Sequence, residues 1–475
     1  MFYTQDSDFT RIRLNPPKRV ILMAEILPFH GIVYNTKKIN NPADVMAPPY
    51  DVIPPPDQQR YHDRHACNVI RLILGQPHEN DTADDNPHTR ATSFFEQWLA
   101  EDTLVREERA AFYLKSIQFV HGNQQMIRYG LIASVRLEPF SKGVVLPHER
   151  TFSKVKSERL KLIKASRANF CPIFGLYPDK NGLYSRLVAS TCDQVPMMEF
   201  ADEQNHHHRL WRITDPTIHD TVYQAIKNES LYIADGHHRY ETALNYRDWL
   251  SQTDPRFDDN HPANFVMMYL ASMQDPGLII LPAHRLLKAL PETQVGEFFK
   301  AARRFFDITP YPYTQMNRDR VRSQIVSDLA AQTGRNAMVV GGKGHTNYYL
   351  LTLKAGVMDE LYGDTLDETI RYLDVTVLTR LVLVELLGFD QARLDNADLI
   401  GYTSQACTAM QAVQTGECDM AFVLNPTSIE QVRQVAHKRL IMPRKSTYFY
   451  PKVISGIVLN DVDPQRSTAP PSNAF

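Results

Sequence analysis

The stretch LYIADGHHRYETALNY, residues 231–246, decides the fold expected for the middle of this chain. Its first four residues form an apolar run typical of a buried strand, and RYETALNYRDWL beyond them has helical character. The junction holds five residues with distinctive chemistry: Asp235, Gly236, His237, His238 and Arg239. The stretch therefore predicts that a strand passes directly into a helix whose first turn carries imidazole and guanidinium groups.

A helix that begins at this junction predicts an anion-binding site. Its N-terminus presents unpaired backbone N–H groups and a partial positive charge. Gly236 lets a ligand approach the backbone closely, and Arg239 offers a planar fork of donors suited to phosphate. Basic residues in a first turn oppose the helix dipole, and a bound anion would explain that cost. The alternative is structural: Asp235 caps the helix, and the histidines are ordinary surface or core groups.

The histidines and cysteines do not have the spacing of a metal site. His237 and His238 are adjacent and point in different directions on a helix, and no H-E-x-x-H spacing exists. The five cysteines are scattered and form no C-x-x-C pair, which argues against structural zinc and against a disulfide framework. We therefore predict no metal held by protein ligands, and a reducing compartment.

Length, charge and apolar patterning narrow the class of protein. With 475 residues and 43% hydrophobic content, the chain is long enough for roughly two to four domains. A net charge of -2 disfavours a globally basic nucleic-acid binder, although a local basic patch remains possible. The polar N-terminus is not a signal peptide, and no apolar run approaches the ~20 residues that span a bilayer. We expect a cytoplasmic protein without a membrane partner.

Strand and helix patterns predict an α/β (α+β) fold with a mixed sheet. Four runs are typical of buried strands: PIFGLYP, LYIA, NFVMMYLASM and LIILP. A helix separates the second run from the third, which predicts a βαβ-like unit. The chain divides into five expected parts: a polar arm at 1–20, an N-terminal α/β region at 21–140, a core at 141–290, a C-terminal α/β domain completing the site at 291–460, and a flexible tail at 461–475.

Three further segments have clear local patterns. AFYLKSIQFV and MIRYGLIASVRL flank HGNQQ, which predicts a β-hairpin. NAMVVGGKGHTNYYLLTL predicts a second hairpin, and its GGKGHT lacks the spacing of a P-loop. LDETIRYLDVTVLTRLVLVELL is typical of one long helix.

The segment 149–167 holds the strongest basic concentration in the chain, seven Lys and Arg residues that include Arg150. Either these side chains bind a phosphate-rich ligand, or they form the solvated face of a helix. Glu149 precedes this helix, and its carboxylate could take a proton from a substrate hydroxyl if burial keeps it basic enough.

A third stretch, MPRKSTYFYPKV at 442–453, combines a point charge with two hydroxyls in Lys445, Ser446 and Thr447. Together they could hold a phosphate or carboxylate, and the alternative is a loop leading into an edge strand. HHHR at 206–209 predicts a polar loop more than a metal contact, and YDVI with Asp51 is a plausible loop beside a ligand.

VLPHERT, ADGHHRYETAL and MPRKSTYFYPK together resemble a large bacterial family of unassigned function, from ILPFHGIVYN to SGIVL. More distantly, the chain resembles the archaeal-type ADP-dependent free serine kinase, which has the ParB/sulfiredoxin-like fold. That family carries Pro-His-Glu, Asp-Gly-His-His-Arg and Pro-Lys-Thr-Thr segments in the same order. The chain departs from the kinase family in two ways. PRKST is one residue longer than the kinase pattern, and residues 1–140 have no counterpart in that family, which leaves the substrate open.

The resemblance implies a ParB/sulfiredoxin-like nucleotide-binding core and a role for each motif. Glu149 would act as general base, with Asp235 and His238 as further catalytic residues. Phosphates would be held by the remaining motif residues: Arg150, Gly236, His237, Arg239, Lys445, Ser446 and Thr447. His284 and Arg285, after LIILPA, are the predicted contacts for a substrate carboxylate.

These roles predict a nucleotide-dependent phosphotransferase acting on free L-serine or a similar small hydroxylated metabolite. ADP or ATP would donate the phosphoryl group, with Mg²⁺ neutralising its charge. One alternative is a nucleotide-binding, ParB-like DNA-binding or scaffold protein, and another is a phosphatase or nuclease using the same anion pocket. The sequence leaves open the acceptor, the choice of nucleotide and the oligomeric state.

Overall fold

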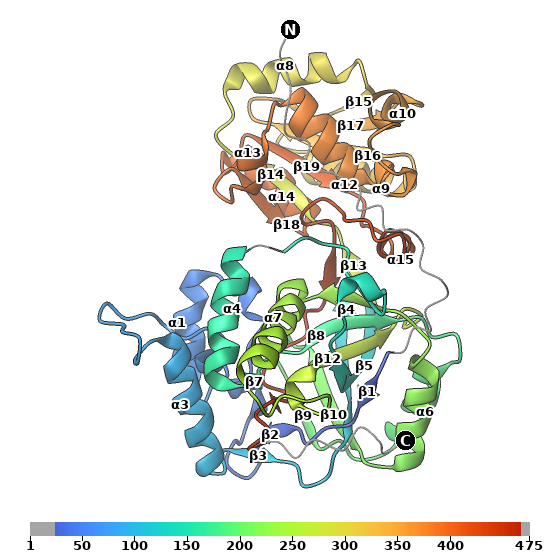
Figure 1. Cartoon of the computed structure of the whole chain (residues 1–475). Coiled ribbons are helices and arrows are strands. Elements are labelled where there is room, and N and C mark those ends of the chain that lie inside the picture. The colour runs from blue at the N-terminus through green and yellow to red at the C-terminus, as the bar shows by residue number, and fades with distance from the viewer. Residues whose placement is uncertain (1–23, 152, 467–475) are drawn as a thin grey trace.

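The computed structural model describes residues 24–151 and 153–466, which form two bodies, one above the other in Figure 1. The larger body contains a nine-stranded sheet and the smaller body a six-stranded sheet. The predicted arm at 1–20 lies outside the described residues, as do residues 467–475 of the predicted tail. No helix in the described ranges is long and apolar enough to cross a membrane.

The nine-stranded sheet mixes parallel and antiparallel pairs. Its path runs β6 (Val145–Leu146), β11 (Leu231–Asp235), β8 (Ile173–Tyr177), β12 (Phe265–Ser272), β5 (Gln124–Arg136), β4 (Phe112–His121), β10 (His207–Ile213) and β9 (Met198–Ala201), with β1 (Ile26–Leu27) also paired to β5. Only β6 with β11 and β8 with β12 are parallel. The predicted α/β fold class with a mixed sheet is therefore confirmed, as is the β4–β5 hairpin.

The predicted βαβ-like unit is wrong in its topology. Helix α7 (His237–Thr253) does connect β11 to β12, but β8 lies between these two strands. Because β11 is antiparallel to β8 while β12 is parallel to it, β11 and β12 run in opposite directions. Strand β8, which comes earlier in the chain, lies between β11 and β12 in the sheet. The periodicity of residues 231–272 does not reveal this order.

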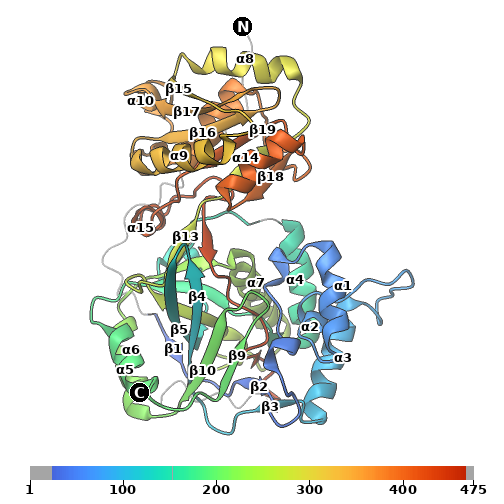
Figure 2. The same ribbon diagram turned by 180° about the vertical axis from the view of Figure 1, so that it is seen from behind.

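Helices cover the larger sheet on two sides. Helix α4 (Ser153–Ser166) packs between α3 (Pro87–Ala100) and α7, while α5 (Leu183–Thr191) packs with α6 (Pro216–Ile226) on the other side (Figures 1 and 2). Two large apolar clusters pack around the sheet, and one of them extends into the smaller body. The N-terminal region adds α1 (Pro55–Arg64), α2 (Ile70–Ile73), and a short pair of β2 (Ile32–Tyr34) with β3 (Leu104–Arg106).

The smaller body is an antiparallel sheet with helices around it. Its order is β15 (Phe306–Pro312), β17 (Asn347–Leu353), β16 (Ala337–Gly342), β19 (Met420–Leu424), β14 (His284–Leu287) and β18 (Ile400–Thr403). The predicted hairpin is confirmed as β16–β17. Its principal helices are α8 (Glu292–Ala302), α9 (Arg318–Ala331), α14 (Ala406–Thr415) and α15 (Ile429–His437).

The long helix predicted after residue 365 is interrupted. It divides into α11 (Glu368–Arg371), α12 (Asp374–Thr376) and a π-helix at Val377–Leu386, with extended backbone at Leu373. The Asn336 side chain donates to the Tyr372 carbonyl at 2.6 Å and to the Asp374 carboxylate at 2.9 Å. A side chain distant in sequence thus takes the carbonyl that a continuous helix would have used.

Two strands connect the bodies. The chain rises through β13 (Ile279–Leu281) and returns through β20 (Tyr448–Tyr450), and the two pair antiparallel (Figure 1). Beyond β20 the chain re-enters the larger body, where β21 (Asn460–Asp461) pairs with β7 (Ala168–Asn169). The third motif therefore lies on the returning connection, beside the larger sheet.

Candidate functional site

Three motifs far apart in sequence meet where the two bodies join. The Glu149 carboxylate accepts a hydrogen bond from the backbone N–H of Lys445 at 3.1 Å. Its other oxygen lies 4.0 Å from His237 Nδ1. The His148 Nε2 and the Thr447 hydroxyl are 3.0 Å apart. PHERT, DGHHR and RKST thus contribute to one cluster of groups.

The DGHHR segment forms the predicted passage from strand to helix. Strand β11 ends at Asp235, and Gly236 takes the position before α7 with φ of +94°. A side chain at Gly236 would adopt a strained backbone conformation, and its Cβ would lie 2.9 Å from the Arg239 guanidinium carbon. No side chain caps the helix, so Asp235 is not its cap. The first turn consists of His237, His238 and Arg239.

Asp235 is the centre of a buried charge cluster. It forms ion pairs with Arg239 and with Lys452, and each of the three side chains is no more than 14% exposed. Burial raises the pKa of Asp235, but Lys452 and Arg239 outweigh it and hold that pKa below the usual range. Arg239 also donates to the Pro172 carbonyl. The Arg239 guanidinium is therefore committed to protein partners and orients the turn.

Two buried histidines lie beside Glu149. The backbone N–H of His148 donates to His237 Nε2 at 3.2 Å, which leaves the ring proton of His237 on Nδ1, facing Glu149. Burial lowers the pKa of both imidazoles. Burial also lowers the pKa of His238, against the attraction of Glu149 and Asp51. The cluster therefore presents neutral imidazoles at neutral pH.

The hydroxyls of the third motif have different partners. Ser446 is buried, its hydroxyl donates to the Pro443 carbonyl, and its own carbonyl accepts from Thr427. Thr447 instead contacts His148. Lys445 is exposed and adopts a left-handed backbone conformation with φ of 57°. Arg150 is likewise exposed.

His284 and Arg285 lie at the start of β14, both 2% exposed. His284 Nδ1 accepts from the Leu424 backbone N–H at 3.2 Å, and burial lowers its pKa to about 4. Arg285 donates to the Ala283 carbonyl and to the Arg444 carbonyl. Arg285 is therefore attached to the loop of the third motif, whereas His284 is bonded within the smaller sheet.

Sequence reasoning missed the role of Lys452, and for Asp51 it predicted only a loop beside a ligand. Lys452 lies within the quoted third stretch, but only its position opposite Asp235 reveals its importance. The turn η2 (Tyr50–Val52) brings Asp51 close to α7, where it raises the pKa of both Arg239 and Lys452 alongside Asp235. The N-terminal region thus contributes to the cluster.

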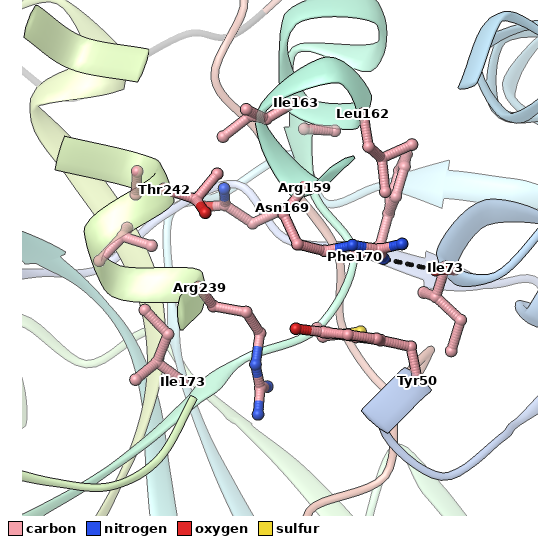
Figure 3. Close-up of a pocket in the computed structure, with 14 residues that line it drawn as sticks. Tyr50, Ile73, Arg159, Leu162, Ile163, Asn169, Phe170, Ile173, Arg239 and Thr242 are labelled. Atoms are coloured by element: carbon pink, nitrogen blue, oxygen red, sulfur yellow. Dashed lines mark hydrogen bonds between the residues drawn. The ribbon is translucent and has the colours of Figure 1, made fainter. Parts of the chain in front are cut away.

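Two cavities adjoin the cluster. One, of about 520 Å³ of atom-free space, lies between α4, α7 and η2, with Arg239 on its wall (Figure 3). The other, of about 1010 Å³, is lined by Lys452, Tyr448, Asp202 and His206 among others. Asp235 and its two cationic partners therefore lie between two spaces that a ligand could enter.

The basic helix α4 has intramolecular partners along its length. Lys156 pairs with Glu241, and Lys161 pairs with Glu158. Arg159 donates to the Ile73 carbonyl, and Lys164 lies 4.0 Å from the centre of the Trp249 ring. These contacts give four of the seven basic side chains of the segment 149–167 a partner within the chain.

The histidines at 206–209 do not form the predicted polar loop. His207 begins β10, and His206 and His208 are 5% and 0% exposed. Both donate to the Asp202 carboxylate, at 3.2 and 3.0 Å. Alternation along a strand carries both rings to the buried face of the sheet. Within the described ranges, no group of three or more His, Cys, Asp or Glu side chains could hold a metal ion.

Comparison with known proteins gives one family and several distant structures. Residues 26–376 match a family described as "Protein of unknown function (DUF1015)". No curated protein sequence matches the chain. A mutant free serine kinase in complex with AMP is 12% identical, with a TM-score of 0.32 over 64% of this chain and 84% of that one. A conserved hypothetical protein from Pyrococcus furiosus is 12% identical, with a TM-score of 0.30 over 65% and 89%. SbnI from Staphylococcus aureus, truncated at its C-terminus, is 10% identical, with a TM-score of 0.31 over 68% and 85%.

Proposed function

The chain belongs to the DUF1015 family, and we propose that it is a nucleotide-dependent phosphotransferase acting on a small hydroxylated metabolite such as free L-serine. The observation that carries this proposal is the position of Glu149, whose carboxylate lies between the first turn of α7 and the backbone of the third motif. A proton acceptor beside a helix N-terminus is what transfer to a hydroxyl requires.

In the proposed reaction, Glu149 takes the proton of the acceptor hydroxyl. The hydroxyl oxygen forms a bond to the terminal phosphorus, and the bond from that phosphorus to the nucleotide breaks. The backbone N–H groups of the first turn of α7, that of His237 included, would face the phosphates, with His238 stabilising the transferring group. The ring N–H of His237 faces Glu149 instead. The ion pair between Asp235 and Arg239 holds the turn at the start of α7 in place.

ADP or ATP is the proposed donor. Mg²⁺ would reach the site with the nucleotide phosphates, since it usually binds one or two carboxylates and keeps several waters. Asp235 is a poor ligand for it because two cations already neutralise that carboxylate, and Glu149 has to stay unbound to accept the hydroxyl proton, so the phosphates and waters would hold the ion. Both bodies would build the site, with residues 291–460 completing the core at 141–290. Lys445 and Arg150, both exposed at the junction, are the proposed additional phosphate contacts.

Phosphorus NMR tests the proposal with ADP or ATP, Mg²⁺ and a panel of hydroxy amino acids. We expect one phospho-product, formed about 10²–10⁴-fold more slowly by Glu149→Gln. Glu158→Gln is the matched control, because Glu158 follows in the same basic segment but pairs with Lys161 and His88 on the surface. No phospho-product from any acceptor, or full activity in Glu149→Gln, rejects the proposal. Release of inorganic phosphate alone would identify a phosphatase using the same groups.

A further inference from the structure

A largely apolar cavity lies beside the charge cluster, between α4, α7 and η2 (Figure 3). It is partly open to solvent and comprises about 520 Å³ of atom-free space, with the solvent at its mouth included. Aliphatic side chains from five segments form much of its wall: Ile73, Leu162, Ile163, Ile173, Ala243 and Val266. Close packing is the rule in protein interiors, so an unfilled space with such a wall favours an apolar or aromatic ligand group.

A few polar groups face the same space. The Thr242 hydroxyl is buried and has no hydrogen-bond partner. The Tyr50 hydroxyl projects into the cavity (Figure 3), and burial raises the pKa of Tyr50 to about 12, so it remains a donor. The Arg159 guanidinium lies 4.1 Å from the centre of the Tyr50 ring and donates to the Ile73 carbonyl, which uses one of its five N–H groups.

The cavity borders the candidate active site at Arg239. Arg239 lines the cavity and also forms the ion pair with Asp235 at the start of α7. Thr242 and Ala243 follow it by three and four positions, so all three side chains lie on one face of the helix. A ligand in the cavity would therefore lie one turn from the predicted phosphate site.

We propose that this cavity binds the nucleobase of a nucleotide. A planar heteroaromatic ring suits apolar walls, and its ring nitrogens and exocyclic groups would pair with the Thr242 and Tyr50 hydroxyls. An aliphatic chain would leave the Thr242 hydroxyl unpaired, at a cost comparable to a lost hydrogen bond. The identification of the ligand as a nucleotide rests on the proposed function, but the cavity can be tested without any phosphoryl transfer.

The test compares ligands that have a base with one that lacks it. Ligand-observed NMR measures binding of adenosine, guanosine, cytidine and uridine, and calorimetry measures ADP and pyrophosphate. We expect at least one nucleoside to bind, and Thr242→Val to weaken ADP binding about three- to tenfold while pyrophosphate binding is unchanged. Thr376→Val is the matched control, because the Thr376 hydroxyl is also buried without a partner but lies in the smaller body.

A second variant fills the space. Ala243→Leu places extra carbons in the cavity and should abolish nucleoside binding while the protein stays folded. Should that variant not fold, Tyr50→Phe removes a donor and keeps the ring under Arg159, with the same threefold to tenfold loss expected. No binding of any nucleoside, or ADP affinity unaltered in both Thr242→Val and Tyr50→Phe, overturns the inference. Nucleoside binding without a phospho-product would uphold it and reject only the kinase.

Discussion

Two carboxylates of the larger body, Asp235 and Asp202, each have two basic side-chain partners, yet the partners differ in kind. Asp235 pairs with Lys452 and Arg239, both charged at all physiological pH values. Asp202 accepts from two imidazoles and from two backbone N–H groups. Lys452 and Asp202 line the same cavity of about 1010 Å³.

The difference between these partners determines how each cluster responds to acid. Burial, with the positive charge of Lys115, lowers the pKa of His208 to about 4, so its bond to Asp202 is one from a neutral ring. His208 Nδ1 is buried without a partner, which agrees with a proton on Nε2. The Asp235 cluster is therefore a fixed arrangement of charges, and the Asp202 cluster is a hydrogen-bond network that acid can disrupt.

The largest effect is expected from removing the charge at Asp235. Asp235→Asn removes the carboxylate with which both Lys452 and Arg239 form ion pairs, so the free energy of unfolding should fall by about 3–5 kcal/mol. Urea denaturation at pH 7 measures it. Asp202→Asn is the matched variant, and its unfolding free energy should fall by only about 1–2 kcal/mol, because the neutral His208 ring needs no counter-charge. Equal losses would show that the two clusters do not differ as described.

A smaller effect is expected from pH. His208 has a pKa of about 4 in the folded protein and an ordinary value of 6.5. Between these values the unfolded chain binds a proton that the folded protein does not, so stability is complete above pH 6.5 and declines as pH falls toward 4. The decline attributable to His208 is about 3 kcal/mol. Asp235 and Asp202, whose pKa values are lowered from 3.8, lose their contributions only below that window.

Urea denaturation from pH 7 to 4 measures this decline in the natural protein and in His208→Gln. The glutamine amide can still donate to Asp202 but cannot take up a proton, so the variant should show a flatter profile. Burial also lowers the pKa of His284 to about 4, so His284 adds the same loss of stability at low pH to the natural protein and to the variant. Parallel profiles would contradict the assignment to His208.

How far the sequence predicted this site depended on the range of the interactions. The strand-to-helix turn at 235–239 was visible because its signals are local: an apolar run, a glycine and a helical pattern. The proximity of Glu149 and Lys445 came from the resemblance, since nothing local relates two residues 296 positions apart. The antiparallel relation of β11 and β12 was missed because β8 inserts between them.

The Asp202 network shows why the rest could not be predicted. HHHR looked like a polar loop because three histidines in sequence are hydrophilic on any scale. Only His206 and His208 are buried, and both depend on Asp202, four and six positions earlier. His206 also contacts Tyr450, 244 residues away in the returning strand. Polar residues become core residues only when such partners exist, and tertiary structure supplies them.

The smallest expected effect concerns Tyr450, whose hydroxyl lies 3.2 Å from His206 Nε2. In the tautomer of the His206 ring that carries one proton, on Nδ1, the ring donates to Asp202, and Nε2 accepts from the Tyr450 hydroxyl. Tyr450→Phe should cost about 0.5–1.5 kcal/mol of unfolding free energy. If the three groups act as one network, this cost shrinks in an Asp202→Asn background and is unchanged in an Asp235→Asn background. Urea denaturation of the single and double variants measures both couplings, and additivity within about 0.5 kcal/mol in the Asp202→Asn cycle would contradict a connected network.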